Sequence, residues 1–155
     1  MTYFQKLLIL AVITLAFGGF TPVSPKALMK EGKAITEKDK LEIQQVIREQ
    51  IEAFLRDDGE AAFSLAAPGI QQKFVTADIF LKMVKDYYMP VYRPQQYDFL
   101  TLEFKNGLPV QLLEVIGPDG WVYKAFYPME FQPNQTWKTA GCYLIRTRER
   151  RQQAI

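Results

Sequence analysis

Residues 54–74, FLRDDGEAAFSLAAPGIQQKF, decide the fold because they end one helix and open another. The Asp57-Asp58-Gly59 triplet interrupts a helical pattern, and either aspartate can cap a short helix over residues 60–66. Pro68 and Gly69 then break this short helix before a turn that reaches Phe74. The stretch therefore predicts consecutive helices separated by tight breaks.

A longer helix precedes this stretch and begins after Thr36. Thr36 followed three residues later by Asp39 is similar to a capping box, with Asp in place of the usual Glu. Apolar residues then recur at three- and four-residue steps, which predicts one buried stripe: Ile43, Val46, Ile47, Ile51, Phe54 and Leu55. A third helix has Thr76 or Asp78 as its N-cap. It ends near Tyr88 or Met89, because Pro90 disfavours the helical state of the residue before it.

From Tyr97 onward the periodicity is that of β-strands. Four segments are rich in β-branched and aromatic residues, at 97–105, 109–116, 121–131 and 136–146. The sequences between them, at 106–107, 118–120 and 132–135, are typical of hairpin turns. This order predicts an α+β domain in which three N-terminal helices pack on one face of a four-stranded antiparallel sheet.

The N-terminus has the pattern of a secretory signal. Lys6 precedes an uncharged apolar run over residues 7–17, and Ala16 and Gly18 offer a small-residue cleavage site. We therefore predict a signal peptide or an uncleaved N-terminal anchor over 1–18, a tether over 19–35, the folded domain over 36–146 and a basic tail over 147–155. Both alternatives predict an exported protein, periplasmic or extracellular, that contacts membrane only through this first segment.

The composition excludes several kinds of chemistry. The chain has no histidine, which removes Ser-His and Cys-His nucleophile systems and the commonest metal ligand. The single cysteine, Cys142, cannot form an internal disulfide, and no histidine or second cysteine can activate it. The acidic cluster of Asp57, Asp58 and Glu60 lacks the alternating ligands of a calcium loop. We therefore expect no metal and no cofactor. The chain has 19 basic and 17 acidic residues, and this near balance predicts no nucleic-acid partner.

The residues around the acidic break carry a family resemblance. An amphipathic helix and an acidic break are followed by Ala-Phe-x-x-Ala-x-Pro-x-Ile, carried here by Asp57, Asp58, Ala62, Phe63, Ala66, Pro68 and Ile70. The pattern resembles the bacterial domain of unknown function 4864 and covers roughly residues 40–146. The resemblance implies a nuclear transport factor 2-like cone, in which a strongly curved sheet wraps around the helices and leaves a pocket at its open end. It implies no substrate, partner or catalytic residue.

Five strand residues are candidates for the wall of such a pocket: Tyr97, Asp98, Glu114, Tyr123 and Tyr127. Alternation places Tyr123 and Tyr127 on one strand face, where an aromatic ring with a polar tip suits a half-buried wall. Glu114 shares its face with apolar residues, so burial would raise its pKa and suit it to act as an acid or base. Packing of the tyrosines and a solvated or salt-bridged position for Glu114 are the alternatives.

The second and third predicted strands carry large apolar residues on both faces. Leu113 and Val115 oppose Leu112 and Ile116, for example. Because the helices of one chain cover only one face, the outer face is predicted to be buried in a homodimer. A tightly coiled sheet that hides this surface without a partner is the alternative.

Together these features favour a non-catalytic module that binds a small apolar ligand or an envelope protein. The alternative function is a cofactor-free enzyme of the isomerase or lyase type, with Glu114 or Asp98 as the base beside a tyrosine donor. A purely structural subunit, which would form a stable oligomer without an open cavity, is a third hypothesis.

Overall fold

The computed structural model describes residues 29–30 and 33–150. The helices in this part of the chain are α1 (Glu37–Leu55), α2 (Gly59–Ser64), α3 (Pro68–Phe74), α4 (Ala77–Tyr87) and α5 (Met89–Tyr92). The strands are β1 (Met29–Lys30), β2 (Lys33–Ala34), β3 (Gln96–Lys105), β4 (Leu108–Ile116), β5 (Trp121–Phe131), β6 (Trp137–Thr139) and β7 (Tyr143–Arg150). The predicted signal peptide or anchor lies outside the described residues.

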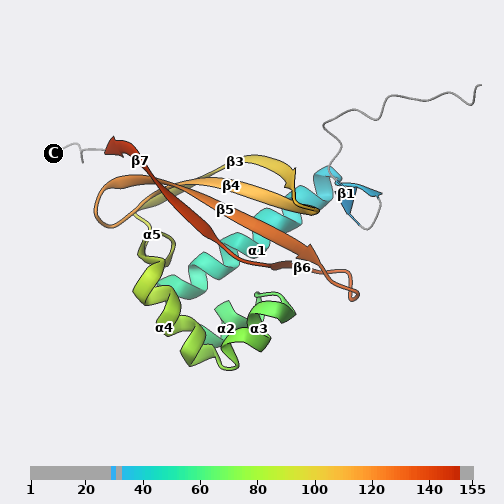
Figure 1. The fold of residues 1–155 in the computed structure, drawn as a ribbon, viewed down its shortest axis with the longest axis horizontal. Coiled ribbons are helices and arrows are strands. Elements are labelled where there is room, and N and C mark those ends of the chain that lie inside the picture. Colours follow the sequence, from blue (N-terminus) through green and yellow to red (C-terminus); the bar gives the residue numbers. More distant parts are fainter. Residues whose placement is uncertain (1–28, 31–32, 151–155) are drawn as a thin grey trace, which may run out of the picture.

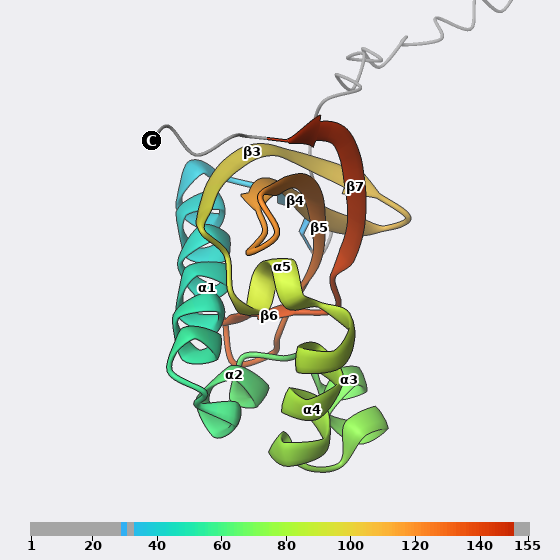
Figure 2. The same ribbon diagram turned by 90° about the vertical axis from the view of Figure 1, so that its left-hand side faces the viewer.

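Strands β3 to β7 form one antiparallel sheet, so the chain is α+β as predicted. The strand order is β3-β4-β5-β6, and β7 also pairs with β5. β6 pairs with residues 129–131 at the end of β5, whereas β7 pairs with residues 121–126 near its beginning. Seen from the end, the sheet is strongly curved, and β3 and β7 arch over the region between them (Figure 2). β1 and β2 form a separate antiparallel pair within the segment predicted to be a tether.

The sheet has five strands rather than four because the last predicted strand, 136–146, is divided. Ala140, Gly141 and Cys142 lie between β6 and β7 and outside both. Gly141 has a φ of 156°, which residues with a side chain rarely adopt. β7 continues to Arg150 and so includes residues 147–150 of the predicted basic tail. The remaining tail residues, 151–155, lie outside the described part.

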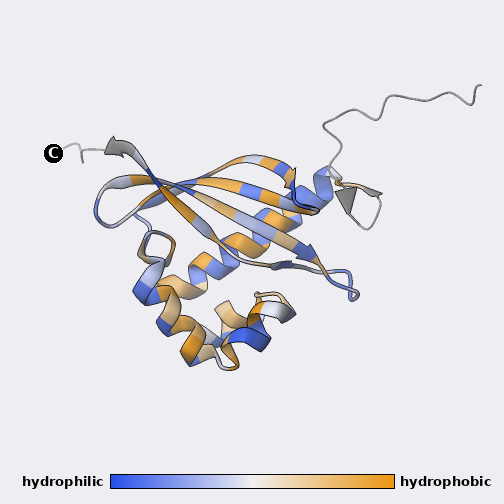
Figure 3. Ribbon diagram, in the orientation of Figure 1, coloured by the Kyte–Doolittle hydropathy of each residue, from blue (hydrophilic) through white to orange (hydrophobic). Residues whose placement is uncertain are grey.

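α1 begins at the predicted capping box and packs on the inner face of the sheet. The backbone amide of Asp39 donates to Thr36 Oγ1 at 3.2 Å, and the Thr36 amide donates to Asp39 Oδ2 at 2.9 Å. Ile43, Ile47 and Ile51 are fully buried in one cluster with sheet residues such as Leu113, Val115 and Tyr127. Figure 3 shows apolar and polar turns alternating along α1, as expected for a helix with one buried stripe.

Two short helices replace segments where the sequence predicted a turn and a crossing. Pro68 is the first residue of α3, where its missing N–H would have had no helical partner. The Gln71 amide then donates to the carbonyls of Phe63 and Ala66, at 3.0 Å each, and fixes the break. Pro90 lies in the first turn of α5 in the same way. Pro68 and Pro90 therefore each lie in the first turn of a helix.

Helices α2 to α5 gather at the end of α1, beside the sheet (Figure 1). Their apolar side chains form a second cluster with the end of α1: Ala53, Phe54, Ala62, Phe80, Val84 and Tyr92. The Phe80 ring is central, with centroids 5.3 Å from Phe63 and 5.8 Å from Phe74. The described part of the chain thus has two apolar clusters, one under the sheet and one among the short helices.

Candidate functional site

Residues of both clusters line a cavity of about 730 Å³. α1 contributes Phe54, α4 contributes Phe80 and Val84, and α5 contributes Val91. The opposite wall comes from β5 and from residues 139–144, where the pairing passes from β6 to β7. A cavity of this size with mostly apolar walls is typical of sites for small molecules.

Tyr127 contributes the most unusual polar group of this cavity. It lies on the inner face of β5 and is only 1% exposed. Its hydroxyl is closed to solvent and has no hydrogen-bond partner of ordinary geometry in the described part of the chain. Burial, and then the neighbouring Cys142 thiol, raise the pKa of this hydroxyl well above its usual range. The group is therefore a neutral donor that folding leaves unsatisfied.

The Cys142 thiol lies against this hydroxyl. Burial raises the pKa of the thiol to about 12, although contact with Tyr127 acts in the opposite direction. The residue as a whole keeps some exposure, so it is the sulfur end that is buried. Because a thiolate rather than a thiol is the nucleophile, Cys142 is inert at neutral pH. A thiol also forms only weak hydrogen bonds, which explains why it leaves Tyr127 unsatisfied.

Two other polar residues at the cavity hold the frame together. The buried Gln50 amide on α1 donates to the carbonyl of Ala62 and to Thr139 Oγ1, at 3.0 Å each. Thr139 Oγ1 in turn donates to the carbonyl of Leu65 at 3.3 Å. These bonds connect α1, α2 and β6, so their role is to position the walls of the cavity.

The rim of the cavity carries a positive charge. Lys73, in the last turn of α3, lines the cavity, and its ammonium lies 5.3 Å from the centroid of the Phe74 ring, another lining residue. No aspartate or glutamate of the described chain lines the cavity. The rim is therefore cationic, whereas the interior is neutral.

Of the five residues predicted from the sequence, only Tyr127 lines this cavity. Tyr97 packs near the sheet core with its ring centroid 5.9 Å from that of Phe99, and burial raises its pKa. The Tyr123 hydroxyl donates to Asp119 Oδ2 at 2.6 Å, and burial followed by this bond raises the pKa of Tyr123.

Asp98 and Glu114 lie on the outer face of the sheet. They are paired across β3 and β4, and Glu114 is paired with Lys124 across β4 and β5. Lys124 Nζ donates to Glu114 Oε2 at 2.7 Å, and Gln96 Nε2 donates to Asp98 Oδ2 at 3.0 Å. Glu114 is therefore salt-bridged, and neither carboxylate lines the cavity.

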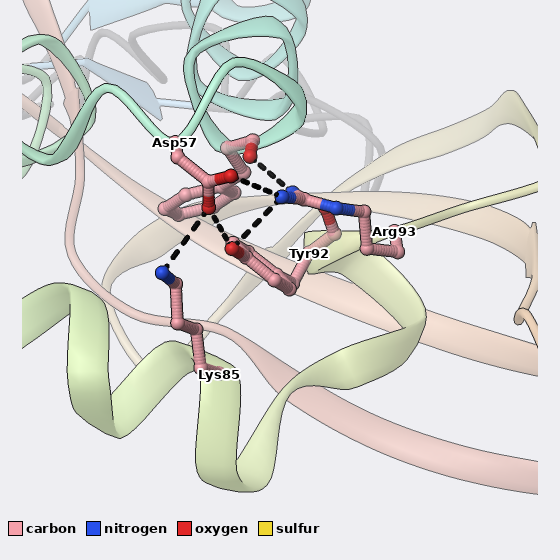
Figure 4. A network of polar contacts seen from close by, with 5 residues as sticks. Asp57, Lys85, Tyr92 and Arg93 are labelled. Carbon is pink, nitrogen blue, oxygen red and sulfur yellow. Dashed lines mark hydrogen bonds and ion pairs between the residues drawn. The ribbon is translucent and has the colours of Figure 1, made fainter.

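A polar network joins the loop between α1 and α2 to α4 and to the end of α5 (Figure 4). Asp57 accepts hydrogen bonds from the Tyr92 hydroxyl and, at 2.8 Å, from Arg93, and it lies 3.2 Å from the Lys85 ammonium. Bonding to Tyr92, then to Lys85 and Arg93, lowers the pKa of Asp57 to about 2. Asp58, not Asp57, caps α2 by accepting from the Ala61 amide at 3.0 Å. The two aspartates of the acidic break therefore have separate structural roles.

The sequence prediction missed Gln50 and Lys73, and for Cys142 it concluded only that the thiol has no disulfide partner and no activating residue. Gln50 had a usable signal, because it lies on the buried stripe between Ile47 and Phe54 and a buried amide needs partners. Lys73 had none, since its position depends on a helix that the sequence did not predict.

The described part of the chain has neither a metal-ligand cluster nor a membrane-spanning helix. No group of three or more His, Cys, Asp or Glu residues there could hold a metal ion. None of its helices is both long enough and apolar enough to span a membrane.

Comparison with known proteins gives a family but no characterised relative. No curated protein and no solved structure matches the chain. The family model described as "Domain of unknown function (DUF4864)" matches residues 36–152. These residues include α1 through β7 and all the residues that line the cavity. The chain therefore belongs to the DUF4864 family.

Proposed function

We propose that this protein binds a small, largely apolar molecule in the cavity, and that the Tyr127 hydroxyl donates a hydrogen bond to an oxygen atom of that molecule. The unpartnered, buried hydroxyl is the observation that carries this proposal. The hydroxyl is closed to water and lies against the Cys142 thiol, so the ligand must displace that side chain to reach it. An oxygen acceptor forms a much stronger bond with a phenol than the thiol does, which favours this displacement.

The remaining cavity walls support the same function. Aromatic and aliphatic side chains from α1, α4 and α5 provide apolar surface, and few polar groups are left to fix a ligand's orientation. These features favour a small ligand over an envelope protein, which would bind to an exposed surface rather than to a cavity.

The enzymatic alternative lacks the arrangement that it requires. An isomerase or lyase of the predicted type needs a carboxylate base beside a tyrosine donor. Asp98 and Glu114 lie on the outer face, and Glu114 is salt-bridged to Lys124. We therefore do not propose catalysis by these residues.

The finer classification of the fold and the location of the protein are also proposals. Helices that precede a curved antiparallel sheet support membership of the nuclear transport factor 2-like superfamily. The pattern of residues 1–18 supports export. Together they suggest a ligand carrier or sensor outside the cytoplasm.

Binding of methyl nonyl ketone to the full-length chain, measured by isothermal titration calorimetry, tests the ligand-binding proposal. This probe has one oxygen acceptor and an apolar chain. Tyr127→Phe should weaken binding by about three- to tenfold, which corresponds to the loss of one net hydrogen bond. Met83→Trp and Ala140→Leu should each fill part of the cavity and abolish binding, because both residues line it.

Leu41→Trp is the matched control, because Leu41 is 66% exposed on α1 and does not line the cavity. It should bind the ketone as the unmodified chain does. Absence of ketone binding, or binding unaffected by Tyr127→Phe and by both cavity-filling substitutions, would overturn the proposal.

A further inference from the structure

We infer that the ligand is an amphipathic acid, whose carboxylate is held at the cavity rim by Lys73 and whose second oxygen is bound in the interior by Tyr127. This inference rests on the proposed ligand-binding function and adds the chemical class and the orientation of the ligand.

Lys73 differs from the other lysines whose side chains the structure describes. The others interact with a carboxylate or a carbonyl oxygen: Lys38 with Glu42, Lys40 with Glu37, Lys82 with Asp86, Lys85 with Asp57, Lys105 with Glu103, Lys124 with Glu114 and Lys138 with the Ser64 carbonyl. Within this part of the chain, Lys73 has only the contact with the Phe74 ring. An ammonium group that lacks an acidic partner at a cavity rim is available to a ligand anion.

The other charges around the cavity do not compete for Lys73. α3 contains no acidic residue, and no carboxylate of the described chain lines the cavity. A ligand anion at the rim would therefore meet a cation and no opposing negative charge, whereas a ligand cation would be repelled.

The different environments of Lys73 and Tyr127 fix which end of the ligand enters first. Tyr127 is fully buried, and its raised pKa keeps it neutral, so it cannot compensate for burial of a carboxylate charge. Lys73 is exposed, so a carboxylate beside it stays partly hydrated. The neutral oxygen therefore lies inside, the carboxylate lies at the rim, and an apolar chain between them contacts side chains such as Phe54, Val84 and Val91.

Calorimetric titration of the full-length chain with three probes tests this orientation. The probes are ω-hydroxylauric acid, its methyl ester and lauric acid. The ester removes only the charge at the rim, and lauric acid removes only the inner oxygen. We expect ω-hydroxylauric acid to bind more tightly than either of the other two.

Two substitutions assign each end of the acid to one residue. Lys73→Met should weaken binding of ω-hydroxylauric acid by about two- to fivefold, as expected for one exposed ion pair, and should leave the ester unaffected. Tyr127→Phe should weaken the hydroxy acid and its ester equally but leave lauric acid unaffected. Added salt should weaken the acid more than the ester.

Lys38→Met is the charge-matched control, because Lys38 lies on α1 with its side chain 84% exposed, outside the cavity. It should leave binding of all three probes unchanged. Equal affinities for acid and ester, or equal effects of Lys73→Met and Lys38→Met, would overturn the role of Lys73. In that case, ketone and ester binding that depends on Tyr127 would still support the proposed function, whereas no binding of any probe would overturn both.

Discussion

A single hydroxyl group, that of Tyr127, should destabilise the ligand-free protein. It is buried without a hydrogen-bond partner in the described part of the chain, so folding removes it from water without compensation. Tyr127→Phe should therefore raise the free energy of unfolding by about 1 kcal/mol, although we expect it to weaken binding of the proposed ligand. Urea unfolding of the ligand-free protein measures this change.

Tyr123→Phe is the control for this prediction. The Tyr123 hydroxyl donates to Asp119 at 2.6 Å, so its removal should lower the free energy of unfolding rather than raise it. A stability loss in Tyr127→Phe similar to that in Tyr123→Phe would indicate that the Tyr127 hydroxyl is already satisfied.

The Asp57 carboxylate should make the free energy of unfolding depend on pH in the acidic range. The pKa of Asp57 is about 2 in the folded protein, compared with 3.8 for an aspartate that has no partners. The folded state therefore favours the ionised form. The resulting stabilisation is fully present above pH 3.8 and is lost as the pH falls from there toward about 2.

Thermal melts across this pH range should detect the effect as a falling melting temperature. Asp57→Asn should have a lower melting temperature at neutral pH and a flatter dependence below pH 3.8. Asn suits this test because Asp57 has a φ of 58°, which Asn tolerates better than most residues. An unchanged pH dependence in Asp57→Asn would assign the acid transition to other carboxylates.

At the scale of single elements, Gln111 on β4 stabilises an irregularity in β3. The register of β3 shifts between Phe99 and Leu102, and Gln111 Nε2 donates to the carbonyls of Leu100 and Thr101 at 3.4 and 3.2 Å. Gln111→Leu would leave these buried bonds unmade. The lost bonds lower the free energy of unfolding, whereas removal of the unpartnered Oε1 atom raises it. The net decrease should therefore be only about 1–2 kcal/mol.

Urea unfolding measures this loss, and hydrogen exchange locates it. Exchange should increase at the amides around the register shift in β3. Gln45→Leu, on the exposed side of α1, should change stability by less than about 0.5 kcal/mol. Equal effects of the two substitutions would contradict the role of Gln111 in this irregularity.

The elements were predictable where one local pattern decides the structure. The Thr36 capping box and the spacing of Ile43, Ile47 and Ile51 predicted α1, because a capping motif and an apolar stripe are properties of adjacent residues. α3 was missed because a proline is compatible both with a break after a helix and with the first turn of the next one, and the sequence around Pro68 does not distinguish the two.

At the scale of the whole molecule, the outer sheet face remains the predicted surface for a second copy. Ile145 is 57% exposed there, in register with Lys124, whereas Val110, Ile116 and Val122 are buried. The curved sheet therefore hides part of the apolar surface without a partner. We expect sedimentation velocity to detect a dimer that Ile145→Asp dissociates, and a monomer at all concentrations would contradict this prediction.

The candidate site was only partly predictable, because its walls depend on how distant elements pack. Alternation placed Tyr123 and Tyr127 on one face of β5, and both pack in or against the cluster under the sheet. It could not determine which face of β4 the helices cover, and for that reason Glu114 appeared to be a pocket candidate. Lys73 joins Tyr127 at the cavity only through the packing of α3 and α4.

The division of the last strand at Ala140–Cys142 also has a consequence for protein synthesis. Residues 139–144 complete one wall of the cavity, yet the ribosome makes them after all the helices described here. Since folding during synthesis proceeds from the N-terminus, Phe54, Val84 and Val91 acquire their last neighbours only when this segment has emerged. A prematurely terminated chain would therefore display those apolar side chains to chaperones and proteases, and the surface that later lines the cavity would first mark the chain as incomplete.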